Sequence, residues 1–237
     1  MWVIRPHVLR EVVHKRYGDG VAIERDIPEA TVSRLPLYRR SLVELASKGE
    51  STVSSARLAE LAGVNAAKVR KDLSHLGSYG VRGVGYDVEY LLRQVGEALG
   101  LDVDAPVVIV GMGNLGQALA RYGGFESRGF PITAFIDSDP DKIGTEFDGV
   151  RIDHLDDLPK LVQERGLSVG IIATPAWAAQ RVADRMVEAG IRSILNFAPT
   201  IISVPPEIPL RKVDLATELQ ILSYYQQRGS VEDERSA

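Results

Sequence analysis

The sequence predicts an α/β protein with two domains, and three observations carry that prediction. Several short helical patterns precede a glycine-rich segment within residues 31–100. From residue 106 onward, short apolar runs alternate with helical patterns, which is typical of a parallel sheet wrapped by helices. The first of those runs leads directly into a G-x-G-x-x-G motif. We therefore expect a winged-helix domain followed by a Rossmann domain, and a chain of 237 residues is long enough for both.

Composition and charge limit the class of protein. No apolar run approaches the roughly 18 residues that a membrane span needs, so we expect a cytoplasmic protein. The absence of cysteine excludes disulfides, iron–sulfur clusters and a cysteine nucleophile. Residues 31–86 carry nine Lys/Arg against four Asp/Glu, whereas residues 87–237 carry 14 against 23. This asymmetry predicts that only the front half contacts a polyanion, with chance clustering as the alternative.

The first domain is expected to contain four helices and a hairpin, after an N-terminal extension at residues 1–30 that shows no sustained periodicity. Ser33 is expected to cap the first helix, which places Pro36 in the first turn, where backbone N–H groups lack partners. The four helices are expected at 33–48, 54–62, 66–76 and 88–99, with Gly63, Gly77 and Gly100 ending the last three and Asn65 and Asp87 capping the last two. Between the last two helices, glycines 80, 83 and 85 alternate with β-forming residues and predict the hairpin.

The second domain is expected over residues 106–213, after a linker at 101–106. Its buried strands are expected at 107–110, 132–136, 169–173 and 191–197, with helices at 115–121, 155–164 and 176–189. Four prolines exclude a helix from residues 199–209.

A last helix is expected at 215–227, within the segment 214–228, followed by a charged and disordered tail at 229–237. This helix is apolar on two sides. A helix of that kind needs two partners, which a dimer supplies, and packing against its own sheet is the alternative.

Residues 54–76 have the spacing of a helix-turn-helix. Ala59 permits a close helix crossing, Gly63 takes a left-handed turn, and Val69 fills the angle between the helices. The second helix presents small and basic side chains outward, as a helix that enters a DNA major groove requires, and an arginine at the hairpin tip suits a narrow minor groove. The candidate DNA-binding residues are Lys68, Arg70, Lys71, Ser74 and Arg82. A plain helical hairpin with a solvated basic face is the alternative.

The motif Gly111-Met-Gly-Asn-Leu-Gly116 follows a buried strand and opens a helix. In that position the first glycine makes the turn, the second lets the backbone approach a pyrophosphate, and the third lets the helix pack on the strand. Asp137 ends the next strand and can accept hydrogen bonds from a ribose diol, which favours NAD over NADP, with Asp139 as the alternative. The candidate cofactor-binding residues are Gly111, Met112, Gly113, Asn114, Leu115, Gly116, Asp137, Thr174, Pro175, Ala198, Pro199 and Leu215. An empty strand–helix turn is the alternative.

Groups suited to catalysis are missing from the second domain. His154 is its one histidine, and its charged surroundings favour a solvated loop over a catalytic base. No His/Asp/Glu cluster has the spacing of a metal site. A dehydrogenase needs an acid or base beside the nicotinamide, so we predict no catalytic residue, no metal and no enzymatic activity.

Five motifs together resemble the Rex family of bacterial redox-sensing transcriptional repressors. They are Val69-Arg-Lys-Asp-Leu-Ser74, Gly77-Ser-Tyr-Gly80, Arg82-Gly-Val-Gly-Tyr86, Gly111-Met-Gly-Asn-Leu-Gly116 and Asn196-Phe-Ala-Pro199. The resemblance runs from Arg34 to Ser223. It implies a homodimer that binds a palindromic double-stranded operator and releases it when NADH binds, with NAD⁺ as the competing ligand.

The resemblance also implies a C-terminal helix that is swapped between protomers and a switch between the domains. The residues at the family's switch positions are Arg40, Tyr122 and Asp214. Some members carry an aromatic residue after that aspartate, where this chain has Leu215, so a ring stacked near the nicotinamide is not expected from this position.

These observations lead to the hypothesis of a repressor that reads the NADH/NAD⁺ ratio. Apolar surroundings disfavour the oxidised, cationic nicotinamide through desolvation, and Leu215, Ala198 and Pro199 are the candidates to supply them. The reduced cofactor then selects an arrangement whose recognition helices no longer match half-sites about 34–36 Å apart. Two other functions remain open, an NAD-dependent oxidoreductase with an accessory winged helix and a DNA-binding regulator that holds the dinucleotide as a structural component.

Overall fold

The computed structural model describes residues 27–78 and 80–235, which form two compact units that divide between Gly100 and Leu101. Most of the expected N-terminal extension, together with Tyr79 and residues 236–237, lies outside the described residues. Each unit has a hydrophobic core of its own. Within the described residues, no helix combines the length and the apolar character needed to cross a membrane.

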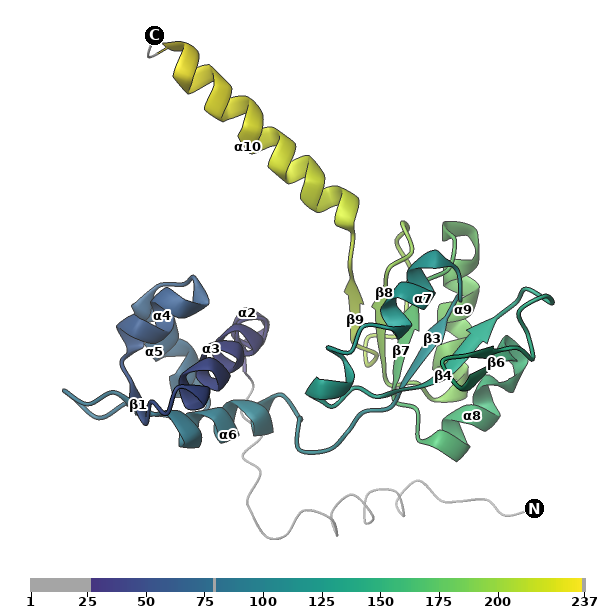
Figure 1. The fold of residues 1–237 in the computed structure, drawn as a ribbon, viewed down its shortest axis with the longest axis horizontal. Helices are drawn as coiled ribbons and strands as arrows, with labels where there is room; N and C mark the ends of the chain where they lie inside the picture. The colour runs from purple at the N-terminus through teal and green to yellow at the C-terminus, as the bar shows by residue number, and fades with distance from the viewer. Residues whose placement is uncertain (1–26, 79, 236–237) are drawn as a thin grey trace. The chain divides into compact units, whose positions relative to one another are not determined.

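The first unit is a group of helices closed by a two-stranded antiparallel sheet (Figure 1). Its helices are α2 (Glu29–Val32), α3 (Leu35–Ser47), α4 (Ser55–Ala62), α5 (Ala66–His75) and α6 (Val88–Ala98), and its strands are β1 (Thr52–Val53) and β2 (Tyr86–Asp87). The four longer helices each contribute a fully buried leucine to one core: Leu42, Leu58, Leu73 and Leu91. The helix-turn-helix and its supporting helices therefore form one packed body.

The expected caps of α5 and α6 are confirmed, and Ser54 caps α4 in the same way. Ser54, Asn65 and Asp87 each accept a hydrogen bond from a backbone N–H in the first turn of the helix that follows. The expected cap at Ser33 is wrong, because residues 29–32 form a helical turn of their own. The Ser33 hydroxyl donates back to the carbonyl of Ala30 instead.

The second unit is built on a seven-stranded sheet in the order β5-β6-β4-β3-β7-β8-β9 (Figure 1). The strands are β3 (Val107–Val110), β4 (Ile132–Asp137), β5 (Glu146–Phe147), β6 (Val150–His154), β7 (Val169–Ile172), β8 (Ser193–Asn196) and β9 (Leu210–Lys212). All neighbours are parallel except β5 and β6. The helices are α7 (Asn114–Ala120), α8 (Leu158–Arg165), α9 (Ala176–Ala189) and α10 (Leu215–Arg235), with short 3₁₀ helices at Glu126–Arg128 and Leu155–Asp157.

Strand β3 lies at the centre of the sheet and is buried on both faces. Val108 and Val110 pack into the core that contains α8 and α9, whereas Val107 and Ile109 pack into a second core on the other face. From β3 the chain moves to β4 on one side and later returns to β7 on the other. The carboxyl ends of β3, β4 and β7 therefore meet at the point where the strand order reverses, which is where ligands of such sheets bind.

The four expected strands and the absence of helix in residues 199–209 are confirmed, whereas β5, β6 and β9 were not expected. The interpretation of His154 as part of a loop is wrong. It ends β6, and its Nδ1 accepts a hydrogen bond from the Asp156 N–H. The disordered tail expected at 229–237 is also corrected, because α10 continues through those positions to Arg235.

Candidate functional site

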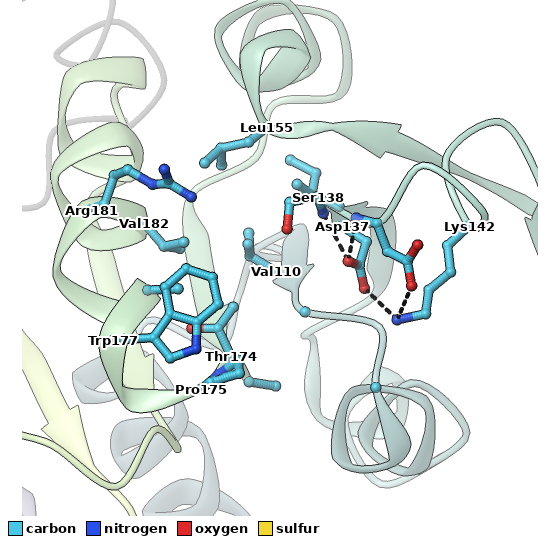
Figure 2. Close-up of a pocket in the computed structure, with 16 residues that line it drawn as sticks. Val110, Asp137, Ser138, Lys142, Leu155, Thr174, Pro175, Trp177, Arg181 and Val182 are labelled. Atoms are coloured by element: carbon cyan, nitrogen blue, oxygen red, sulfur yellow. Dashed lines mark hydrogen bonds and ion pairs between the residues drawn. The ribbon is translucent and has the colours of Figure 1, made fainter.

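A cavity of about 310 Å³ lies at the carboxyl ends of β3, β4 and β7 (Figure 2). It brings together five of the predicted cofactor-binding residues, Gly111, Gly113, Asp137, Thr174 and Pro175. Side chains that the sequence did not single out for this role also line it, among them Lys142, Leu155, Trp177 and Arg181. Figure 2 shows Trp177 and Arg181 on the α9 side, facing Asp137 and Lys142 across the cavity.

The three glycines of the loop after β3 have different surroundings. Gly111 has a φ of 101°, and a Cβ there would lie 2.6 Å from the carbonyl oxygen of Ala173. A Cβ on Gly116 would overlap the carbonyl oxygen of Gly111, so this glycine lets α7 pack against the loop. A Cβ on Gly113 would meet no atom within 4 Å. The loop is therefore open to a ligand at Gly113 and closed by packing at the other two.

Asp137 is nearly buried, and its carboxylate accepts four hydrogen bonds from its own unit. Oδ1 accepts from the Ser138 and Asp139 N–H groups at 2.8 and 2.9 Å, and Oδ2 from the Met112 N–H at 2.8 Å and Lys142 Nζ at 3.2 Å. Burial alone would raise the pKa of this carboxyl, but the hydrogen bonds from Asp139, Met112 and Lys142 outweigh it and lower the pKa. The charged carboxylate thus ties the glycine loop to the end of β4.

Asp139 has more acceptor capacity left for a ligand than Asp137 has. One of its oxygens accepts the Asp141 N–H, the other lies 3.4 Å from Lys142 Nζ, and its side chain is 41% exposed. Asp137 already accepts four hydrogen bonds, whereas Asp139 keeps acceptor positions open at the cavity.

Thr174 and Trp177 mark the opposite wall of the cavity. The Thr174 hydroxyl is buried and has no hydrogen-bond partner within the described residues, which is unusual unless a ligand supplies one. The Trp177 side chain is 77% exposed in the first turn of α9. A tryptophan two residues after the predicted Thr174-Pro175 pair is a signal that sequence reasoning could have used.

Several predicted cofactor residues do not line this cavity. Met112 is fully buried with its side chain in the core, and Gly116 serves packing. Asn114 and Leu115 form the exposed first turn of α7. Asn196 hydrogen-bonds to the Ala198 N–H and to the Thr200 carbonyl, and this turn leaves Ala198 buried while Pro199 is exposed. Leu215 is 63% exposed at the start of α10.

The predicted recognition helix, α5, has the orientation that its sequence pattern requires. Val69 and Leu73 are fully buried, whereas Lys68, Arg70 and Lys71 are exposed. Arg70 Nη1 donates to the Ser55 hydroxyl at 3.1 Å. Ser74 is half-buried and donates to the Lys71 carbonyl, so its hydroxyl proton is used within its own helix.

The predicted hairpin is present but shorter than its glycine pattern suggests. Val81 and Gly85 form a single bridge around an exposed turn that contains Arg82, as predicted. The next residues, Tyr86 and Asp87, pair with β1 instead of continuing the hairpin. A Cβ on Gly85 would overlap the Val53 carbonyl oxygen, so this turn, which we call the wing, is packed directly against β1.

Asp72, on the inner side of α5, is a functional candidate that the sequence analysis missed. It is 1% exposed and accepts hydrogen bonds from Thr31 Oγ1, from Arg34 Nε and Nη2, and from Tyr38 Oη, at 2.6–2.9 Å. Burial raises its pKa, but these hydrogen bonds outweigh burial and the net pKa is lowered. Asp72 therefore fastens α5 to α2 and α3.

The three predicted switch residues have identifiable surroundings. Arg40 is exposed on α3. The Tyr122 ring packs edge-on against Phe125, with 5.0 Å between centroids. Asp214 accepts from the Thr217 N–H at the start of α10 and lies 3.0 Å from Lys212 Nζ, and these contacts lower its pKa. Within the described residues, Tyr122 and Asp214 are not bonded to each other.

Comparisons with known proteins match both units. A family model described as "Putative DNA-binding protein N-terminus" matches residues 26–74, and one described as "CoA binding domain" matches residues 102–200. The redox-sensing transcriptional repressor Rex of Streptomyces coelicolor is 59% identical over 209 residues, which cover 88% of this chain and 81% of that protein.

Solved structures of RSP, a Rex-family repressor, are also similar. Its complex with β-NAD⁺ and operator DNA has 35% identity and a TM-score of 0.81, covering 88% of this chain and 96% of that one. Its complex with β-NADH has 33% identity and a TM-score of 0.78, covering 88% and 98%.

Proposed function

The chain belongs to the Rex family of redox-sensing transcriptional repressors, and on that premise we propose a division of tasks between its two units. The protein is a repressor that binds operator DNA and responds to NADH and NAD⁺. We assign DNA binding to α5 and the wing, through Lys68, Arg70, Lys71, Ser74 and Arg82, and NAD(H) binding to the cavity at the glycine loop. The open space at Gly113 beside the unpartnered Thr174 hydroxyl is the observation that carries this assignment.

The residues around the cavity fit the adenosine half of the cofactor. Gly113 and the first turn of α7 offer backbone N–H groups to the pyrophosphate. Asp139 accepts the ribose diol, and Asp137 positions the glycine loop beneath it. Thr174 supplies a hydroxyl, and Trp177 offers its exposed ring to the adenine.

The nicotinamide half requires apolar surroundings that one chain supplies only in part. NAD(H) brings a ring that is positively charged when oxidised and neutral when reduced. Pro199 and Leu215 are exposed apolar side chains that disfavour the charged form through desolvation, whereas buried Ala198 supports the turn beneath Pro199. We assign the remaining contacts to a second copy of the chain.

Helix α10 supports a homodimer in which the helix is exchanged between protomers. Its large apolar side chains are 45–67% exposed: Leu215, Leu219, Ile221, Leu222, Tyr224 and Tyr225. Its own sheet therefore leaves this surface uncovered, contrary to the alternative in which α10 packs against that sheet. The packing of two apolar sides against a partner stabilises the helix and joins the two chains.

Coupling between the units is assigned to Arg40, Tyr122 and Asp214. The Asp214 carboxylate carries its charge at neutral pH and is held by Lys212 in this structure. In one of the two cofactor states, Asp214 would pair with Arg40 in place of Lys212. That exchange would convert cofactor binding into a change in the spacing of the recognition helices.

We propose no catalytic role. The curated relatives are named as regulators, and within the described residues no group of three His, Cys, Asp or Glu side chains could hold a metal ion. Because the target is operator DNA, we place the protein in the cytoplasm.

Operator release tests the proposed function. The full-length protein bound to its operator is titrated with NADH and with NAD⁺ in separate experiments, and release is followed by fluorescence anisotropy. We expect NADH to weaken operator binding about 5–150-fold, which corresponds to a coupling of about 1–3 kcal/mol, and NAD⁺ to do so much less. Equal release by both would favour a structurally bound dinucleotide, and consumption of NADH with a carbonyl compound would favour an oxidoreductase.

A further inference from the structure

A groove of about 350 Å³ lies between the recognition helix and the wing. Ser54 and Ser55, at the start of α4, form one side of it, Arg70 of α5 lines it, and residues 80–86 form the other side. The three glycines of that segment carry no side chains, so a bound chain can approach the backbone closely. The groove is therefore lined by glycine backbone and by two arginines, Arg70 and Arg82.

The charge of this groove is entirely positive. Arg70 and Arg82 are its only charged lining residues, and no carboxylate lies within 4.0 Å of either one in the described part of the chain. Two other arginines of the unit, Arg34 and Arg57, are paired with Asp72 and Glu60. Burial raises the pKa of Tyr86, so this lining phenol is uncharged at neutral pH.

Arg70 is also held in place before any ligand binds. Its Nη1 donates to the Ser55 hydroxyl at 3.1 Å, which leaves the other guanidinium donors available. Arginine donors in a fixed fork match the oxygens of a phosphate. An arginine that lines a groove and has no carboxylate partner is suited to an anionic ligand.

The position of the groove identifies that anion. In B-form DNA a single sugar–phosphate backbone separates the major groove from the adjacent minor groove. If α5 enters the major groove and Arg82 reaches the minor groove, the intervening strand has to pass between the two elements. That passage is the groove lined by Arg70 and the wing glycines.

We propose that this groove is a phosphate clasp, in which Arg70 binds one phosphate of the operator backbone and Ser55 orients Arg70. Arg70 is thereby a backbone contact that fixes the register of α5, and base recognition is left to other residues of the helix. The inference rests on the proposed function, because it takes operator DNA as the ligand.

Binding of the full-length protein to its operator, and to a variant with one substituted half-site base, tests the clasp across a salt series. We expect Arg70→Gln to weaken binding to both duplexes about tenfold and by the same factor. The slope of log K against log salt should fall by about 2, since a dimer loses two phosphate contacts. Arg93→Gln removes an exposed arginine of α6 outside the groove and should leave the slope unchanged.

A methylphosphonate scan of the operator locates the contact. At one position per half-site, replacement of a phosphate by a neutral methylphosphonate should weaken binding by the wild-type protein. The same replacement should not further weaken binding by Arg70→Gln. The clasp would be overturned if Arg70→Gln changed the base preference but left the salt slope unchanged. It would also be overturned if the methylphosphonate scan had the same profile for Arg70→Gln and for the wild-type protein. If Arg70→Gln fails to fold, Arg70→Lys, which keeps the charge but loses the fork, should retain the slope and lose affinity. Failure of the wild-type protein to bind any operator would instead contradict the proposed function.

Discussion

Two buried carboxylates, Asp72 and Asp137, each accept four hydrogen bonds from their own unit. In both cases the hydrogen bonds outweigh desolvation and lower the pKa. Each residue joins segments that are distant in sequence: Asp72 connects the recognition helix to α2 and α3, and Asp137 connects the glycine loop to β4. A buried charge that is fully hydrogen-bonded in this way is costly to disrupt.

Replacement of Asp72 by asparagine tests the first of these networks. We expect Asp72→Asn to lower the stability of the unit by about 3 kcal/mol at neutral pH, because Arg34 loses its charged partner. The folded-state pKa of Asp72 lies below the unfolded value, so its contribution is present above about pH 4 and is lost as the pH falls through the folded-state pKa. Urea unfolding measured from pH 7 to pH 3 should show that the difference in the free energy of unfolding between variant and wild type becomes smaller as the pH falls.

A matched variant separates charge from shape in the same network. Tyr38→Phe removes one neutral donor to Asp72 and should cost about 2 kcal/mol at neutral pH, less than Asp72→Asn. Because this hydrogen bond is one of those that lower the pKa of Asp72, its cost should also shrink as the pH falls toward 3. If the loss of stability in Asp72→Asn stays constant from pH 7 to pH 3, the charge of the carboxylate contributes nothing to the stability of the unit.

At the level of elements, the glycine loop and α7 separate packing from ligand binding. Gly113 adopts a φ of −79°, which any residue can take, and it faces open space. A Cβ on Gly116 would overlap the carbonyl oxygen of Gly111. One motif therefore contains a position where a methyl group would obstruct only a ligand and another where it would disturb the fold.

Alanine at these two positions should give opposite results. We expect Gly113→Ala to keep the melting temperature of the wild type and to weaken NADH binding at least tenfold, because the methyl group occupies the approach to the pyrophosphate. Gly116→Ala should lower the melting temperature through its clash with the loop. Calorimetric titration and thermal unfolding of both variants provide the comparison, and unchanged NADH affinity in Gly113→Ala would contradict the assigned pyrophosphate site.

The elements that sequence reasoning identified are those with strong local signals. Strand β3 is a continuous apolar run, and α9 was predicted with its observed bounds because Pro175 and Gly190 delimit it. The missed strands β5 and β9 have two and three residues with one apolar side chain each, so neither length nor periodicity distinguishes them from a loop.

Sequence reasoning could predict the part of the candidate site whose backbone is set by a local motif. It could not predict the side chains that reach the cavity only through the tertiary fold. The glycine loop and Asp137 followed from their positions after strands. Trp177 and Arg181 reach the cavity because α9 places residues four apart on one face, which became apparent only once the cavity was known. Asp72 was missed because helical spacing alone gave no sign of Thr31, Arg34 and Tyr38 converging on it.

At the scale of the whole molecule, α10 is the helix whose large apolar side chains remain exposed in a single chain. A helix with exposed leucines and tyrosines along its length gains stability mainly from a partner. Leu215, at the start of this helix, does not line the cavity at its own sheet.

Charged substitutions on α10 should therefore weaken the proposed dimer. We expect the double variant Leu219→Glu and Leu222→Glu to sediment as a monomer at concentrations where the wild type is a dimer, with a matching loss of operator affinity. Gln220→Glu adds negative charge at a polar position of the same helix and should remain dimeric. Analytical ultracentrifugation provides the measurement, and an unaltered dimer in the double variant would exclude α10 from the interface.

The pairing of β1 with β2 has a mechanical consequence for regulation. Because β2 begins directly after the wing and Gly85 lies against the carbonyl of Val53, we expect the turn carrying Arg82 to stay packed on the strand that precedes α4. We therefore expect a ligand bound outside the first unit to act on that unit as a whole. An effector then changes only the distance or the angle between two such units. We therefore expect an isolated first unit to bind one operator half-site with the same affinity at any redox state of the cell.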